Sequence, residues 1–129
     1  MDTPQQFDWV TVRNSCSVVE VFKRLRLDVE EDVERFNDVR QLGYQTGFRV
    51  VGNTSGNVFV VCGSVSPMPE VKFSLGADRI EIDDHVSLKK FHVTLTLNKV
   101  GRCMFRYDGE ELEPWQLRRM ALEALLFSS

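Results

Sequence analysis

The sequence predicts an α+β fold, in which an antiparallel meander sheet of about six or seven strands packs against an N-terminal amphipathic helix and a C-terminal helix. Two observations lead to this prediction. From residue 47 onward, short runs of alternating apolar and polar residues are separated by turn residues, which is typical of strands joined by hairpins. Before that point, and again after Pro114, apolar residues recur at the three- and four-residue spacing of a helix.

Composition bounds the class of protein. A chain of 129 residues, 43% hydrophobic and 27% charged, suits a single globular domain over residues 1–129. The net charge is −3 and the two signs are mixed, so we expect no nucleic-acid binding. There is no apolar run of the ~20 residues that a membrane span needs, and the first six residues lack the features of a signal peptide. We therefore expect a cytoplasmic protein that does not bind membranes.

The cysteines are Cys16, Cys62 and Cys103, an odd and widely spaced set. A disulfide framework would favour an even number in a secreted context. We therefore predict free, buried thiols, with neither a disulfide nor a metal site. No motif indicates a cofactor.

The chain begins with an alternating run, residues 7–12, that predicts a short strand. Ser17 and Glu20 then fit a capping box and predict a helix start, with Asn14 as an alternative cap one turn earlier. Apolar residues follow at helical spacing, and Gly43 is predicted to end the segment. Asp28 could cap a second helix, so the pattern allows one helix or two. The apolar stripe comprises Val18, Phe22, Leu25, Val29, Val33 and Phe36.

Six strands are predicted after this helix, at residues 48–51, 58–62, 71–75, 79–82, about 88–97 and 102–107. The run 58–62 is apolar throughout and predicts a central strand covered on both faces. Two prolines exclude residues 64–69 from a central strand. The turn at residues 98–101 predicts a hairpin.

The last helix is predicted to start at Pro114, because proline suits the first helical position. We interpret the preceding acidic residues, Asp108, Glu110, Glu111 and Glu113, as favouring the positive end of this helix. Apart from Glu123, residues 120–127 are apolar and leave almost no polar face, so the helix needs more cover than one flat sheet gives. A curved sheet, a second helix or a symmetric partner subunit could each supply it.

The order of strand, long helical segment, meander and C-terminal helix resembles the helix-grip architecture of START-like and Bet v 1-like ligand-binding domains. In those domains a curved sheet wraps around the last helix and leaves an apolar cavity. Cystatin-like and other helix-plus-meander folds share much of this order. The resemblance covers most of the chain, rests on element order without a sequence motif, and transfers no functional residue.

Two functional hypotheses follow. The first is a non-enzymatic binding domain that takes an apolar small ligand between sheet and helices, or a protein partner or second copy through the C-terminal helix. Its candidate residues are Trp115, Leu122, Leu126 and Phe127, although packing in the core is the more common role of a tryptophan such as Trp115. The second is a small enzyme with an acid/base site near Asp83, Asp84 and His85. Such a polar cluster is more typical of a loop between strands.

Overall fold

The structure, a computed structural model, describes residues 7–43, 46–64 and 69–127. Within these ranges the helices are α1 (Trp9–Ser15), α2 (Val18–Val39) and α3 (Pro114–Phe127). The strands are β1 (Phe48–Gly52), β2 (Val58–Gly63), β3 (Glu70–Leu75), β4 (Ile80–Asp84), β5 (Lys89–Leu97), β6 (Cys103–Tyr107) and β7 (Glu110–Leu112). The predictions made on residues 1–6 and on Pro67 lie outside the described residues.

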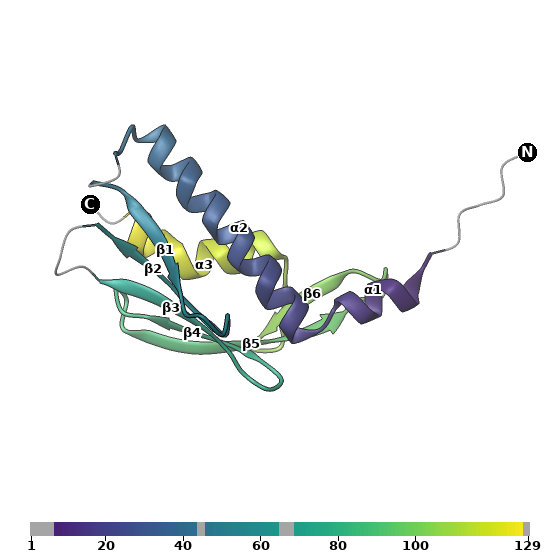
Figure 1. The fold of residues 1–129 in the computed structure, drawn as a ribbon. Helices are drawn as coiled ribbons and strands as arrows, with labels where there is room; N and C mark the ends of the chain where they lie inside the picture. The colour runs from purple at the N-terminus through teal and green to yellow at the C-terminus, as the bar shows by residue number, and fades with distance from the viewer. Residues whose placement is uncertain (1–6, 44–45, 65–68, 128–129) are drawn as a thin grey trace, which may run out of the picture.

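The seven strands form one antiparallel sheet in the order β1-β2-β3-β4-β5-β6-β7, which confirms the predicted meander (Figure 1). The 98–101 hairpin is confirmed as well, with Leu97 opposite Cys103. The seventh strand follows a tight turn at Asp108 and Gly109, whose φ angles of 51° and 81° are those of a type I′ hairpin turn. Glu110 and Glu111 therefore lie in a strand, and the expectation that they favour the start of α3 is wrong.

Helices α2 and α3 lie on the same face of the sheet, and the core forms between them and that face (Figure 1). The predicted stripe of α2 is confirmed, because its four central residues are buried and its two ends are half-buried. In β2 the buried residues alternate with half-buried ones. The prediction that both faces of β2 are covered is therefore wrong, since the helices cover one face. The largest fully buried side chains are Phe22, Phe59, Phe73, Ile80, Ile82 and Leu117.

Helix α2 is a single helix, which decides the question that Asp28 left open. It begins as predicted, with the Ser17 hydroxyl accepting a hydrogen bond from the Glu20 amide at 3.3 Å. It ends at Val39, so the prediction of an end at Gly43 is wrong. Gln41 takes the left-handed conformation (φ 55°) that glycine usually supplies, and the Leu42 amide donates to the Asn37 carbonyl at 2.8 Å. This six-to-one bond is typical of a Schellman motif.

Residues 9–15 form helix α1, so the prediction of a strand over residues 7–12 is wrong. The Asp8 carboxylate caps the helix by accepting hydrogen bonds from the Thr11 amide (3.1 Å) and the Thr11 hydroxyl (2.7 Å). A short alternating run does not distinguish a strand from two helical turns, whereas an aspartate three residues before a threonine can cap a helix. Helix α1 has no buried residue, and it lies beside the β5–β6 hairpin (Figure 1). There the ring of Phe7 packs over Gly101.

The prediction of three free thiols is also wrong. Cys16, between α1 and α2, forms a disulfide with Cys103 at the start of β6, with a Cα–Cα distance of 5.6 Å. The two residues are 87 positions apart in the sequence. The meander carries β6 beneath the start of α2, and this long-range placement brings the two sulfur atoms together. Cys62 is free and half-buried on the sheet face away from the helices.

Helix α3 packs against the sheet and α2, two of the three covers that the sequence allows, but Met120 and Phe127 on its outer side are exposed, so the expected cover is only partial. Its buried residues are Leu117, Ala121, Leu122, Leu125 and Leu126. Arg118 fastens the two helices together, because its guanidinium pairs with Asp32 at 2.6 Å and with Asp28 at 3.6 Å. Within the described ranges, none of the helices is both long and apolar enough to cross a bilayer.

Candidate functional site

A cleft of about 360 Å³ lies where α1, α2, the β5–β6 hairpin and the start of α3 meet. We call it the apolar cleft. Its floor and walls are mainly apolar: Val12, Val21, Leu25, Leu95, Cys103, Met104, Phe105 and Pro114. Its polar lining consists of Ser15, Glu20, Arg24 and Asp28. The apolar lining thus comes from helices α1, α2 and α3 and from strands β5 and β6.

The geometry of the cleft follows from how the chain folds locally. Val21 and Leu25 lie one turn apart on α2 and so share a face, while Leu95 and Phe105 are cross-strand partners on the sheet face beneath them. The Cys16–Cys103 disulfide holds the junction of α1 and α2 against β6. One of the two bonded residues, Cys103, is itself part of the cleft lining.

Charges at the rim of the cleft are largely paired. The Arg24 guanidinium lies 3.3 Å from the Asp28 carboxylate, and Asp28 also receives Arg118 at 3.6 Å. The Arg24 side chain is 73% exposed although it is paired with Asp28. An apolar interior with paired charges at its mouth suits binding of an apolar group better than acid/base chemistry, which uses an ionisable group held inside a pocket.

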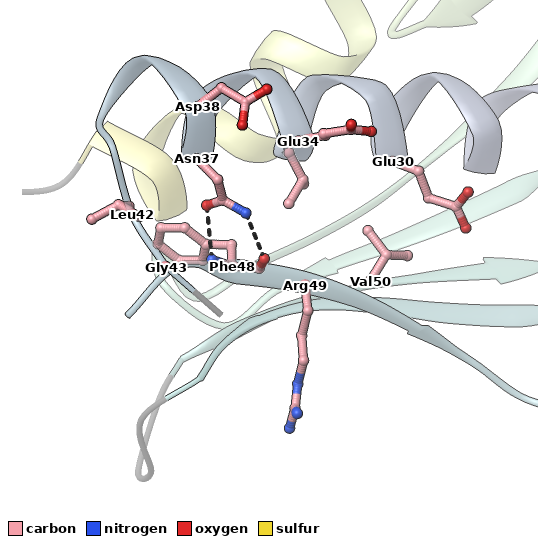
Figure 2. A pocket seen from close by; sticks show the side chains of 10 residues that line it. Glu30, Glu34, Asn37, Asp38, Leu42, Gly43, Phe48, Arg49 and Val50 are labelled. Carbon is pink, nitrogen blue, oxygen red and sulfur yellow. Dashed lines mark hydrogen bonds between the residues drawn. The ribbon is translucent and has the colours of Figure 1, made fainter. Parts of the chain in front are cut away.

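A second hollow, about 390 Å³ and more open, lies between the C-terminal half of α2 and the edge strand β1 (Figure 2). We call it the edge groove. Its apolar floor is formed by Val33, Leu42, Phe48 and Val50, and its upper wall carries the carboxylates of Glu30, Glu34 and Asp38. Figure 2 shows these three carboxylates spaced along α2 above β1.

The Asp83-Asp84-His85 cluster is placed apart from both hollows. Asp84 is buried, and its carboxylate accepts hydrogen bonds from the amides of Val86 (2.9 Å) and Ser87 (3.2 Å). This carboxylate thus closes the turn between β4 and β5. His85 is exposed, with Nε2 3.3 Å from Asp83 and Nδ1 3.6 Å from Glu70. The geometry is that of a polar connection between strands.

The binding residues expected on the C-terminal helix are not brought together. Leu122 and Leu126 are buried in the core, whereas Trp115 is 50% exposed and Phe127 is 59% exposed. The two aromatic residues are separated by twelve positions, about 18 Å along a helix, and so do not form one surface. The interpretation of Trp115 as a core residue is wrong. Its indole N–H donates to Glu113 at 2.8 Å instead.

The sequence predictions missed the residues that line the apolar cleft. Val21 was a detectable signal, because it adds an apolar side chain at the border of the α2 stripe, where a helix facing solvent would carry a polar one. The contribution of α1 had no such signal, since residues 7–12 were expected to form a strand.

Searches for a metal site and for related proteins add no assignment. In the part of the chain that the structure describes, no group of three or more His, Cys, Asp or Glu side chains could hold a metal ion. No protein-family model matches the chain, and no curated protein or solved structure matches it significantly.

Proposed function

We propose that this protein is a non-enzymatic binding domain whose apolar cleft holds the apolar part of a small molecule. The observation that supports the proposal is the cleft itself, with its apolar lining drawn from α1, α2, β5, β6 and the start of α3. Its volume of about 360 Å³ is within the range of small-molecule pockets. All of its lining residues lie in helices or strands, and none lies in a loop.

The lining also indicates the kind of molecule. An apolar body would lie on Val21, Leu25, Leu95 and Phe105. A polar or anionic end would point to the mouth, where the exposed Arg24 guanidinium could pair with it in place of Asp28. Each buried apolar group of such a ligand contributes roughly 25 cal/mol per Å² removed from water. We therefore expect a compact amphipathic molecule.

The enzyme hypothesis receives less support. A catalytic carboxylate must reach a substrate, whereas the Asp84 carboxylate is buried and occupied by two backbone amides. His85 remains exposed, with the carboxylates of Asp83 and Glu70 at 3.3 and 3.6 Å from its ring nitrogens. Both observations favour a structural role for the cluster, and so favour binding as the function.

The proposal is tested with a probe for apolar sites, 8-anilinonaphthalene-1-sulfonate, whose fluorescence rises when it leaves water. The variant Val21→Trp fills the cleft with an indole ring and should weaken probe binding at least tenfold. The control Val19→Trp lies on the same helix at an exposed position outside the cleft lining, and it should leave binding unchanged. Circular dichroism must show that both variants are folded. Equal probe binding by the two folded variants would refute the proposal.

A further inference from the structure

We propose that the edge groove is a second binding site, in which an extended, lysine- or arginine-rich segment of another protein adds to the sheet as a strand beside β1. This site is separate from the apolar cleft and does not rest on its proposed function. Three observations support it: an open strand edge, a side chain that already occupies part of that edge, and a row of carboxylates above it.

The outer edge of β1 is open. Among the described residues, β1 pairs with β2 and with no strand on its other side. At the two ends of the pairing, the Gly47 carbonyl accepts from the Ser64 amide and the Asn53 amide donates to the Val58 carbonyl. In an antiparallel pair the backbone groups alternate between the two edges. The backbone groups of the odd-numbered residues of β1 therefore form hydrogen bonds with β2. Those of the even-numbered residues, Phe48, Val50 and Gly52, point to the outer edge.

Asn37 of α2 shows what fits this edge. Its side-chain amide donates to the Phe48 carbonyl at 2.9 Å, and its carbonyl accepts from the Phe48 amide at 3.0 Å (Figure 2). One carboxamide thus makes the pair of hydrogen bonds that a residue of a neighbouring strand would make. Val50, two residues along the same edge, has no such cover in the described structure, and so offers the next pair of bonds to an incoming peptide.

The carboxylates above the edge determine the charge of the peptide. Glu30, Glu34 and Asp38 recur every four residues and so line one side of α2 above β1 (Figure 2). Glu30 is paired with Arg26 at 3.0 Å. Glu34 and Asp38 are exposed, and neither has a salt bridge within the described ranges. Basic side chains at alternate positions of an added strand could reach them.

The α2 carboxylates also indicate which kind of partner can bind in the edge groove. A second copy of this chain, docked edge to edge through β1, would bring two rows of α2 carboxylates toward each other, and like charges at close range oppose association. An acidic peptide would meet the same repulsion. A basic extended segment satisfies the open backbone groups and the carboxylates together, so it is the occupant that we infer.

The test uses two dye-labelled decapeptides, one alternating lysine with valine and one alternating glutamate with valine. Fluorescence anisotropy at low salt should show binding of the lysine peptide and not of the glutamate peptide. The double variant Glu34→Lys/Asp38→Lys should weaken binding of the lysine peptide at least tenfold. Its matched control, Glu31→Lys/Glu111→Lys, makes the same change in net charge at exposed positions outside the groove and should change binding less than twofold.

Hydrogen exchange followed by NMR reports on the edge directly. The Val50 amide should exchange quickly in the free protein and slowly with the lysine peptide bound, whereas the Val51 amide, bonded to β2, should be slow in both. Failure of the lysine peptide to bind, equal weakening by the two double variants, or an unprotected Val50 amide in the complex would each overturn the proposal. A dimer in sedimentation that protects Val50 without peptide would overturn it in favour of a second copy.

Discussion

The Cys16–Cys103 disulfide should be a main source of stability, and replacing both cysteines with alanine tests this. The bond joins residues 87 positions apart. In the chain-entropy model, closing a loop of this length stabilises the folded state by about 4–5 kcal/mol, and measured values for disulfides are typically about 2–4 kcal/mol. For a domain of this size the urea m-value is about 2 kcal/mol per M. We therefore expect the urea midpoint of Cys16→Ala/Cys103→Ala to fall by about 1–2 M.

The assay is urea unfolding followed by circular dichroism, with and without dithiothreitol. The reductant should lower the midpoint of the wild type toward that of the double variant, and should leave the double variant unchanged. The control Cys62→Ala should respond to reductant like the wild type, because Cys62 is outside the bond. If the denatured but unreduced wild type shows three reactive thiols, and dithiothreitol does not move its midpoint, the reasoning is wrong.

Three further predictions follow from single contacts. Replacing the buried Asp84 with alanine leaves two backbone amides unpaired and should lower the free energy of unfolding by about 1–3 kcal/mol. The control His85→Ala, at an exposed site, should change it by less than about 0.5 kcal/mol. Chemical denaturation measures both changes. The hydrogen bond from the Thr11 hydroxyl, and then the one from the Thr11 amide, lower the pKa of Asp8 below its ordinary value of 3.8. The carboxylate should therefore cap α1 fully above pH 3.8, and the cap should be lost as the pH falls through the lowered pKa. An NMR titration of the Thr11 amide and the Asp8 carboxyl follows this loss. Leu126→Asp places a charge in the core and should unfold the protein, and a folded monomer or dimer of this variant in sedimentation would contradict the structure.

The elements that sequence analysis predicted correctly are those with a long periodic signal. The α2 stripe repeats over six apolar residues, and the run of β5 alternates for seven, so chance patterns at this length are rare. Helix α1 failed because six alternating residues fit a strand and a helix almost equally, and the cap at Asp8 decided between them. Strand β7 was a missed signal rather than an absent one, since Asp108-Gly109 is a strong hairpin turn.

The disulfide and the apolar cleft could not be read from local sequence. Cys16 and Cys103 are brought together by the folding of the whole meander. An odd number of cysteines does not exclude a disulfide, because two can pair while the third stays free. The same is true of the cleft, whose lining is collected from residues 12 to 114 of the chain. Permanent disulfides are favoured in oxidising compartments and are rare in the cytoplasm. The bond therefore weighs against the cytoplasmic location expected from the sequence.

The most direct test of the proposed function is to locate a bound apolar molecule on the protein. With methyl-labelled protein and 8-anilinonaphthalene-1-sulfonate, intermolecular NOEs should connect the aromatic protons of the probe with the methyl groups of Val21, Leu25 and Leu95. NOEs confined to exposed methyl groups such as those of Val10 and Val100 would place the probe on the surface and contradict the account.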